Sequence, residues 1–402
     1  DRKHYFYPDL PKGYQTTQMY QPIILAGYVD SVLEDGTAVH VRIHHAHMEE
    51  DAGKLTHGDG YSLVDLNRAG TPLIEIVSEP DIHTPAAARA YATELHRLMT
   101  YAGVTYGDLY HGNMRFDVNI SVALKGASEL GKRAEVKNLN SFRSVERAAE
   151  YEFRRQVARI EKGERVVQET RGWNDDTGVT TSQRSKEDAQ DYRYMPDADI
   201  PPIVLSDQEI ADIQADMPML PGEFRRILNE AGLDYAIAET ALGITESEVR
   251  DFLATIATTT NGEVRRRIMN WLIIDMQGRV SAGEDSWSGK QLLKEHLIDL
   301  AQMAIDDKVS SNGAVQIMFE MLSSGDAPMM IAEQHNLLQV SDEGAIAAIV
   351  DEVLADPASA ASIADIKAGK DKAIGFLVGQ VMKRSQGKAN PALAQKLIRE
   401  KL

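Results

Sequence analysis

The feature that most constrains the fold is a stretch of alternating and acidic sequence from residue 39 to residue 79. Its second half contains an aliphatic run, Leu73 to Val77, between Gly70-Thr71-Pro72 and a proline at position 80, which predicts a β-strand. Glu75 lies in the middle of that strand. Because a lone charge is costly to bury among aliphatic side chains, Glu75 needs a cation, hydrogen-bond donors or access to solvent.

A second group of acids, Glu49, Glu50 and Asp51, precedes this strand. Together with Glu75 they could form an oxygen-rich site of the kind that holds Mg²⁺ beside phosphates. Acid triplets also occur in solvated turns, and a strand glutamate often lies on an exposed face. The spacing alone therefore leaves a metal site and a solvated surface both open.

Composition narrows the class of protein. The 402 residues favour two or three domains, and the hydrophobic fraction of 43% is sufficient for real cores. We find no apolar run of about 18 residues and no charged-then-apolar leader, so we expect a cytoplasmic protein without membrane contact. The absence of cysteine excludes disulfides, thiolate metal ligands and a cysteine nucleophile.

Charge is unevenly distributed along the chain. The net charge of −18 argues against a general nucleic-acid binder, whose contact surface is usually basic. Residues 367–402, however, contain nine Lys and Arg residues against two acids, so this tail is +7 and the rest is −25. The tail is therefore the part of the chain best suited to contact phosphates.

The first half of the chain alternates as an antiparallel sheet does. Residues 21–47 predict a meander, and apolar residues every three to four positions predict a helix over 84–99 that begins at Thr84-Pro85. Residues 114–124 alternate strictly between polar and apolar, which predicts a strand. One face of this strand is polar and contains Arg115, Asp117 and Asn119. The other face points inward and contains Val118, Ile120, Val122 and Leu124. A further strand from Ala134 leads into a helix capped at Asn140 or Ser141 that runs to about Arg159.

Three patterns in this half have competing interpretations. Gly126 to Arg133 has the spacing of a phosphate-binding loop, but Arg133 replaces the required Ser or Thr and the segment lies between two strands. We interpret it as a hairpin turn. His44, His45 and His47 suggest zinc, although two histidines on one strand face are more often simply packed. Glu135 and Lys137 share a strand face and suit a metal and phosphate site, or else form an ordinary ion pair.

The sequence changes character near position 206. A proline-rich stretch from Pro196 to Pro202 ends the strand-rich part, and helical patterns follow from Asp207 to Ser323. We therefore predict three domains with an α+β fold class: an antiparallel, strand-rich domain over 1–205, an all-α domain over 206–326, and a small basic helical tail domain over 327–402.

Several segments closely resemble the B subunit of the tRNA-dependent aspartyl/glutamyl amidotransferase. The matching motifs are His47 to Lys54, Ser62 to Gly70 and Pro72 to Pro80, with support from Arg2 to Asp9 and from Asn270-Trp271-Leu272, and the likeness runs the length of the chain. The resemblance implies a cradle domain similar to the glutamine synthetase/guanido kinase fold. It also implies that a segment with a Gly-Leu-Glu-x-His motif precedes Asp1 in the family.

The resemblance further implies a role for individual residues. Glu50, Glu75 and Lys3 would be catalytic; Lys3, Arg115 and Lys137 would bind phosphate; and Glu50, Glu75 and Glu135 would hold Mg²⁺. The family has Thr-Arg at His44-His45 and an acidic pair at Tyr110-His111, so these four residues receive no role. In the basic tail, five residues would contact tRNA: Lys370, Lys372, Lys383, Arg384 and Lys388.

The implied activity is ATP-dependent amidation of misacylated Glu-tRNA(Gln), Asp-tRNA(Asn) or both. The side-chain carboxylate would be phosphorylated by ATP, and ammonia would then displace phosphate. The chain has neither a Gly-x-Ser-x-Gly elbow nor a cysteine, so ammonia would come from a partner protein. The resemblance implies that this partner is an amidase A subunit, and that a small C subunit stabilises the complex of the A and B subunits. Two alternatives are the archaeal Glu-tRNA(Gln)-specific paralogue and a non-catalytic tRNA-binding scaffold.

Overall fold

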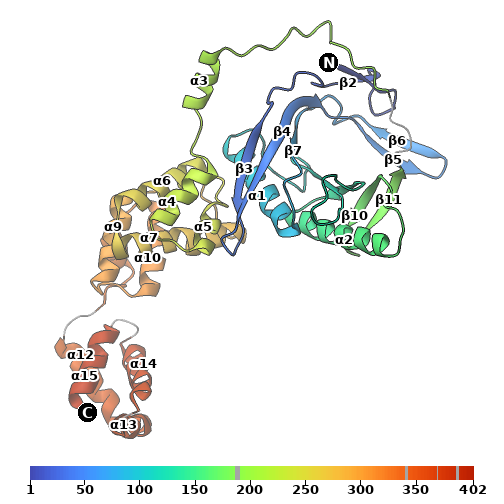
Figure 1. Cartoon of the computed structure of the whole chain (residues 1–402). Coiled ribbons are helices and arrows are strands. Elements are labelled where there is room, and N and C mark those ends of the chain that lie inside the picture. Colours follow the sequence, from blue (N-terminus) through green and yellow to red (C-terminus); the bar gives the residue numbers. More distant parts are fainter. Residues whose placement is uncertain (186–190, 340–342, 369, 386–388) are drawn as a thin grey trace. The chain divides into compact units, whose positions relative to one another are not determined.

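The computed structural model describes residues 1–185, 191–339, 343–368, 370–385 and 389–402. The chain divides into two compact units, Asp1–Gly222 and Glu223–Leu402, which we describe separately (Figure 1). The first unit contains every strand of the described part of the chain, and the second contains helices. The predicted change from strands to helices near position 206 is therefore confirmed in outline.

The first sheet contains two strands from the acidic stretch over residues 39–79. Its strands are β3 (Gly27–Val32), β4 (Ala38–Glu50) and β7 (Pro72–Ser78), in the order β3-β4-β7, and both pairs are antiparallel. A register shift between Ile43 and His45 marks an irregularity in β4 where it pairs with β7. The predicted strand around Glu75 is thus confirmed, with one added residue at each end.

The second sheet has the order β11-β10-β9-β8. Its strands are β8 (Phe116–Ile120), β9 (Ala134–Leu139), β10 (Glu169–Asn174) and β11 (Val179–Ser185). The pairs β8·β9 and β10·β11 are antiparallel, but β9 and β10 are parallel. The expectation of a wholly antiparallel domain was therefore wrong at this pair, because helix α2 (Phe142–Glu161) forms the crossover that parallel strands require.

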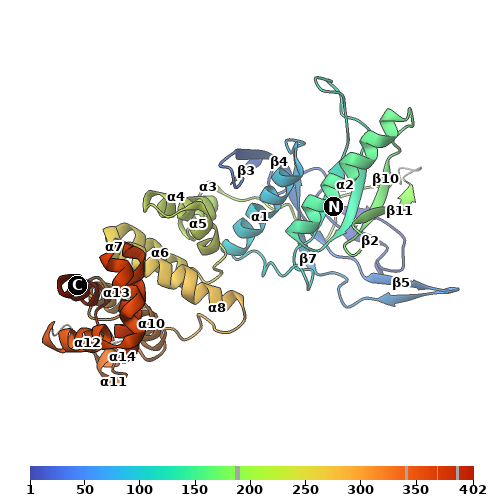
Figure 2. The ribbon, with the colours of Figure 1, turned by 90° about the horizontal axis from the view of Figure 1, so that it is seen from below.

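Two helices pack against these sheets. Helix α1 (Pro85–Tyr101) begins as predicted, with Thr84 accepting from Ala87 N and Pro85 in the first turn. Helix α2 is capped by Ser141 and runs beside α1 (Figure 2). Burial along both helices recurs at helical spacing and produces two small cores against the strands, one around Val41 and Leu95 and the other around Val136 and Val145.

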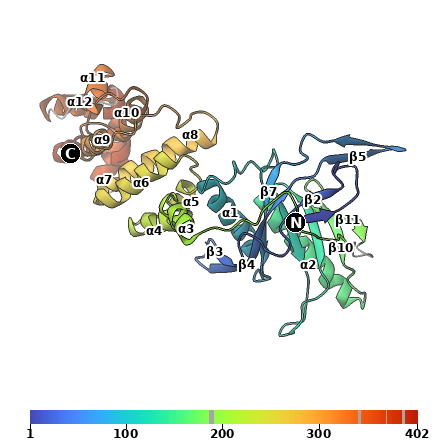
Figure 3. The ribbon, with the colours of Figure 1, turned by 90° about the horizontal axis from the view of Figure 1, so that it is seen from above.

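Two short hairpins complete the first unit. Strands β1 (Arg2–His4) and β2 (Tyr14–Thr16) pair with each other, and a single bridge joins Arg2 to Met195. Strands β5 (Lys54–Gly58) and β6 (Tyr61–Asp65) form a hairpin that projects from the sheets (Figure 3). All five residues of β6 are exposed.

The strand predicted over 114–124 is shorter than expected. Strand β8 ends at Ile120, and Leu124, predicted to point inward, is 84% exposed. The alternation does hold within β8, where Asp117 and Asn119 are exposed and their neighbours are half-buried. The phosphate-loop pattern from Gly126 to Arg133 lies in the connection between the antiparallel strands β8 and β9, as its interpretation as a turn predicted.

Helix α3 (Asp207–Ala215) begins at a capping box formed by Ser206 and Glu209. The second unit has a core built around fully buried residues such as Phe224, Leu253 and Met276. A π-helical turn, Trp271–Met276, interrupts the helix predicted over 261–277. The helices of this region are α4 (Pro221–Glu230), α5 (Tyr235–Ala241), α6 (Ser247–Thr259), α7 (Gly262–Asn270), α8 (Gln277–Ser281), α9 (Lys294–Ile305), α10 (Ser311–Ser324) and α11 (Pro328–Gln334).

The C-terminal helices have an apolar cluster of their own. Ile346, Val350, Leu377 and Ile398 are among its buried members. The helices that supply the cluster are α12 (Glu343–Ala355), α13 (Ala360–Lys367), α14 (Ile374–Arg384) and α15 (Pro391–Lys401). Within the described ranges, no helix is long and apolar enough to cross a membrane.

Candidate functional site

Pairing between β4 and β7 places three site residues on one face. His47 lies opposite Glu75 in the antiparallel register, and Glu49, two residues further along β4, faces the same side. A nitrogen or oxygen atom from each of the three lies within 4.8 Å of the others, and His47 Nε2 is 3.1 Å from Glu49 Oε1. We call these three residues the acid cluster.

The first hairpin and its neighbours hold Glu49 in its ionised form. Thr17 Oγ1 donates to Glu49 Oε1 at 2.9 Å, and Gln15 Nε2 donates to Glu49 Oε2 at 3.1 Å. Burial opposes ionisation of this carboxyl. The hydrogen bonds from His47 and Thr17 and the charge of Lys3 outweigh burial, so the pKa of Glu49 is lowered.

Glu75 experiences the opposite balance. Although part of the residue is open to solvent, desolvation of its carboxyl and the nearby Glu49 carboxylate raise the pKa of Glu75. The pKa of His47 is also raised, chiefly by its hydrogen bond to Glu49 and against the effect of burial. A divalent cation would relieve the repulsion between Glu49 and Glu75, and carboxylate oxygens are the ligands that Mg²⁺ prefers. The acid cluster therefore fits a divalent metal.

Glu50 does not join the acid cluster. As the next residue along β4, it faces the other side of the strand, where Lys12 Nζ donates to its carboxylate at 2.5 Å and Thr16 N donates at 2.9 Å. Burial again opposes ionisation, but these bonds lower the pKa of Glu50. The structure thus brings Glu75 together with Glu49, and the metal role predicted for Glu50 has no support from this geometry.

The second sheet contributes another group of charges. Lys137 Nζ is 2.5 Å from Asp117 Oδ2 and 3.3 Å from Glu135 Oε1, and Thr170 Oγ1 donates to Glu135 Oε2 at 3.0 Å. Burial opposes the charge on Lys137, but the two acids raise its pKa. The charge of Asp117 also helps to raise the pKa of Glu75. The predicted residues Lys137 and Glu135 are therefore together, and Asp117 links them electrostatically to the acid cluster.

The other two predicted phosphate ligands have different surroundings. Lys3 lies close enough to the acid cluster for its charge to lower the pKa of Glu49, and its Nζ lies 4.9 Å from the centre of the Tyr192 ring. Arg115 Nη2 donates to Asp51 Oδ2 at 2.9 Å, and Arg68 Nε lies 3.1 Å from the same oxygen. Lys3 is thus beside the acid cluster, whereas Arg115 is engaged by an acid outside it.

Three imidazoles form a chain that ends at the acid cluster. His44 Nδ1 lies 2.6 Å from His45 Nδ1, and His45 Nε2 lies 3.1 Å from His47 Nδ1. Desolvation, followed by the charges of His47 and His44, lowers the pKa of His45. The lowered pKa favours the neutral imidazole, which can hydrogen-bond to His47. A zinc site made of these three histidines has no support among the described residues, where the group that brings its ligand atoms within 4.8 Å of one another is His47 with Glu49 and Glu75.

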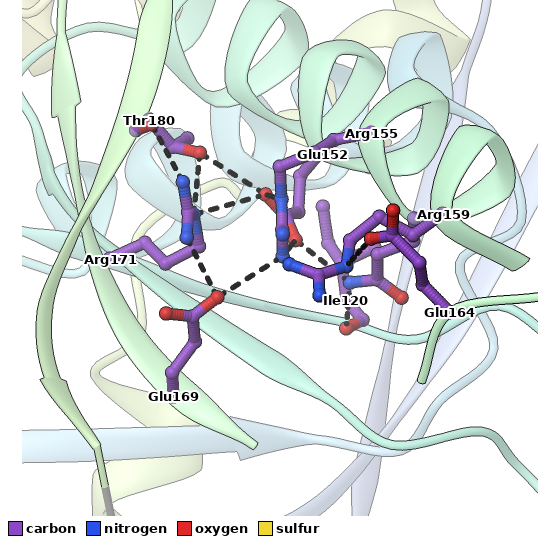
Figure 4. Close-up of polar contacts among 9 residues, drawn as sticks. Ile120, Glu152, Arg155, Arg159, Glu164, Glu169, Arg171 and Thr180 are labelled. Atoms are coloured by element: carbon purple, nitrogen blue, oxygen red, sulfur yellow. Dashed lines mark hydrogen bonds and ion pairs between the residues drawn. The ribbon is translucent and has the colours of Figure 1, made fainter. Parts of the chain in front are cut away.

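A buried ionic network lies under the second sheet (Figure 4). Glu152, which is fully buried, accepts from Arg155 Nη2 at 2.6 Å and lies 3.5 Å from Arg171 Nε. Arg171 also donates to Glu169 at 2.7 Å. The network joins helix α2 to β10, the strand from which Thr170 donates to Glu135. Sequence reasoning placed Arg171 in a charged stretch but did not pair it with Glu152.

The predicted tRNA-contacting residues occupy the C-terminal helices. Lys372 and Lys383 are exposed, whereas Lys370 pairs with Asp365 at 3.0 Å and Arg384 pairs with Asp356. Lys388 lies outside the described residues. Two of the four described cations are thus already partnered by acids.

Comparisons with known proteins address the family directly. A family described as the GatB/GatE catalytic domain matches residues 1–211, and one described as the GatB domain matches residues 250–402. The chain is 43% identical over its whole length to the B subunit of the aspartyl/glutamyl-tRNA(Asn/Gln) amidotransferase of Persephonella marina, covering 84% of that protein. Identity is 44% with the Lachnospira eligens protein and 45% with that of Alcanivorax borkumensis, with all of this chain and 84% of each relative covered.

The chain belongs to the family of B subunits of tRNA-dependent amidotransferases. The resemblance seen in the motifs is therefore confirmed. Within this family, the two matched regions divide between the strand-rich unit that contains the acid cluster and the helical region that contains the basic tail.

Sequence reasoning named Glu49 among the acids of a possible metal site but gave the metal role to Glu50, and it placed Asp117 on a polar strand face without assigning it to the site. The signal for Glu49 was its spacing of two residues from His47, because both then share a strand face with whatever lies opposite His47. The signal for Asp117 was its place on the polar face of β8 opposite the charged pair on β9. Both signals depend on knowing the strand register.

Proposed function

We propose that this chain is the kinase and amidating subunit of a tRNA-dependent amidotransferase. The observation that carries the proposal is the acid cluster with Lys3 beside it, in a chain of this family. In the proposed reaction, ATP phosphorylates the side-chain carboxylate of a misacylated Glu-tRNA(Gln) or Asp-tRNA(Asn). Ammonia then displaces phosphate to form the amide.

The residues of the site suit the first step. Glu49, kept ionised by Thr17 and His47, and Glu75 would bind Mg²⁺, with Glu135 and Asp117 close by on the second sheet. Bound Mg²⁺ would neutralise charge that develops on the transferred phosphoryl group. Lys3 and Lys137 would bind phosphate oxygens as point charges, because a lysine ammonium donates to them without fixed geometry.

The amide nitrogen requires a second protein. The sequence contains no Gly-x-Ser-x-Gly motif, which would supply a serine nucleophile, and no cysteine, which would supply a thiol nucleophile. We propose that an amidase A subunit hydrolyses glutamine and supplies ammonia, with a small C subunit in the same complex. The relatives' names, which specify one lettered component of an amidotransferase, support an assembly of several different chains.

The test is a substitution in the acid cluster of the full-length, assembled complex. Glu75→Gln keeps the shape of the side chain but removes its charge, so tRNA-dependent ATP hydrolysis should fall to background. Glutamine hydrolysis by the partner should remain measurable. Glu34→Gln, at an exposed turn after β3, is the matched control and should retain full ATP hydrolysis.

Near-normal ATP hydrolysis by Glu75→Gln would contradict the proposed metal site. If the wild-type complex turned over no ATP with any misacylated tRNA, the chain would instead be a non-catalytic tRNA-binding scaffold. Assays with Glu-tRNA(Gln) and Asp-tRNA(Asn) in parallel would also show which tRNA is the substrate.

A further inference from the structure

The two faces of strand β10 make different contacts. Because side chains alternate along a strand, Thr170 and Arg171 point to opposite faces of the sheet. Arg171 lies on the face toward α2, in the buried ionic network with Glu152 (Figure 4). Thr170 lies on the other face, where its Oγ1 donates to Glu135 Oε2 at 3.0 Å. The strand is thus tied to α2 on one face and contacts a predicted site residue on the other.

The side chain of Thr170 is held firmly in its place. The parallel ladder between β9 and β10 pairs Thr170 directly with Glu135. Thr170 is only 8% exposed, and a β-branched side chain has few rotamers open to it. The pairing of β10 with β11 shifts register between Thr170 and Arg171, and such irregularities are common in strands next to active sites. The Thr170 hydroxyl is therefore a fixed hydrogen-bond donor.

The two oxygens of the Glu135 carboxylate have partners of different stiffness. Oε1 lies 3.3 Å from Lys137 Nζ, but this ammonium also lies 2.5 Å from Asp117 Oδ2 and stands at the end of a flexible four-carbon chain. Oε2 accepts from the short and buried Thr170 side chain. Because the terminal torsion of a glutamate has no sharp preference of its own, the direction of this carboxylate depends on its stiffer partner.

We propose that Thr170 is a positioning residue for Glu135 and sets the direction in which this carboxylate faces the bound cation. The inference rests on the proposed function, in which Glu49 and Glu75 bind Mg²⁺ and Glu135 lies close by. Thr170 acts only through its hydrogen bond to Glu135. Neighbouring groups that bond to metal-binding carboxylates orient them, and the loss of one such partner typically costs about 10- to 100-fold in metal affinity or activity.

A purely structural role for this hydrogen bond makes a different prediction. A buried hydroxyl needs a partner, and Glu135 could serve Thr170 in that way alone. Loss of the hydroxyl would then lower the free energy of unfolding without changing the affinity for a metal ion. Metal affinity, measured beside the integrity of the strand pairing, therefore separates the two roles.

The experiment uses variants of Thr170 in the intact complex. Thr170→Val keeps the shape of the side chain but removes the donor, and Thr170→Ala removes the donor with less bulk. Thr170→Ser keeps the hydroxyl, and Thr181→Val is the matched control at an exposed threonine of the neighbouring strand β11. Mn²⁺, as a substitute for Mg²⁺, is titrated by electron paramagnetic resonance. Hydrogen exchange of peptides from β9 and β10 reports whether the strands remain paired.

Thr170→Val and Thr170→Ala should both weaken Mn²⁺ binding by about 10- to 100-fold while the exchange protection of β9 and β10 is kept. They should also lower kcat for tRNA-dependent ATP hydrolysis and leave the KM for aminoacyl-tRNA unchanged, because Thr170 acts on the metal site and not on tRNA. Thr170→Ser should restore most of the Mn²⁺ affinity, and Thr181→Val should bind Mn²⁺ as wild type does.

Wild-type Mn²⁺ affinity in both variants that lack the hydroxyl would overturn the inference and leave the proposed function intact. An equal loss in Thr170→Ser would also contradict it, because the hydroxyl would then not be the group that matters. Loss of exchange protection in both Thr170→Val and Thr170→Ala would assign the bond to folding alone and refute the positioning role. Failure of the proposed function looks different, since the wild-type complex itself would then neither bind Mn²⁺ nor hydrolyse ATP, and both proposals would fall.

Discussion

The buried ionic network beneath the second sheet allows a sharp prediction about stability. Glu152 is fully buried, and the Arg155 and Arg171 side chains around it are only 14% and 11% exposed. Glu169 is the other acid in contact with these two arginines. Glu152→Ala would leave two buried guanidinium groups with one carboxylate. Breaking a buried ion pair in this way costs about 3–5 kcal/mol, a large part of the roughly 5–15 kcal/mol that stabilises a typical domain.

The matched control is Glu150→Ala on the same helix. Glu150 pairs with Arg154 on the surface, where the two side chains are 48% and 75% exposed, so its loss should cost about 0–1 kcal/mol. Both variants make the same change in helix propensity, which therefore cancels. Hydrogen exchange of peptides from α2 and β10 in the intact protein gives the local free energy of opening, with peptides from Glu223–Leu402 as an internal reference. Equal losses for the two variants would refute the reasoning.

Three further predictions concern other parts of the chain. Burial raises the pKa of Tyr91 from 10.0 to about 12. The stabilising contribution of the neutral Tyr91 side chain should therefore be fully present below pH 10 and be lost as the pH rises toward 12. Tyr91→Phe should remove this pH dependence of the free energy of unfolding, measured by alkaline unfolding. Lys132→Ala should leave the apparent KM for ATP unchanged, whereas a tenfold increase would restore the phosphate-loop interpretation. Lys372→Gln and Lys383→Gln together should make the slope of log affinity for tRNA against log salt concentration shallower by about 0.7–0.9 per lost phosphate contact. An unchanged slope would show that these two lysines do not contact tRNA.

Much of the local structure could be predicted because it depends on local signals. The strand around Glu75 follows from an aliphatic run between turn residues, and α1 and α2 begin where Thr84 and Ser141 offer their side chains as caps. The place of Lys137 beside Glu135 follows from strand alternation alone. Each of these inferences needs only the few residues around it.

The remaining features depend on contacts between distant segments. The choice between Glu49 and Glu50 is decided by which face of β4 meets Glu75, and a shift of one residue in register would exchange them. The parallel pair β9·β10 requires a crossover that no motif announces. The partnership of Glu152 with Arg171 joins residues from a helix and a strand through tertiary packing. No local sequence pattern contains that information.

The central claim is tested most directly by the affinity of the intact complex for a divalent cation, because the proposed function gives the metal to Glu49 and Glu75. Mn²⁺ can stand in for Mg²⁺, and its binding can be titrated by electron paramagnetic resonance. Glu49→Gln should weaken Mn²⁺ binding by about tenfold or more, whereas Glu50→Gln, on the opposite face of β4, should bind Mn²⁺ as wild type does. Wild-type affinity in Glu49→Gln, or a larger loss in Glu50→Gln, would contradict the account.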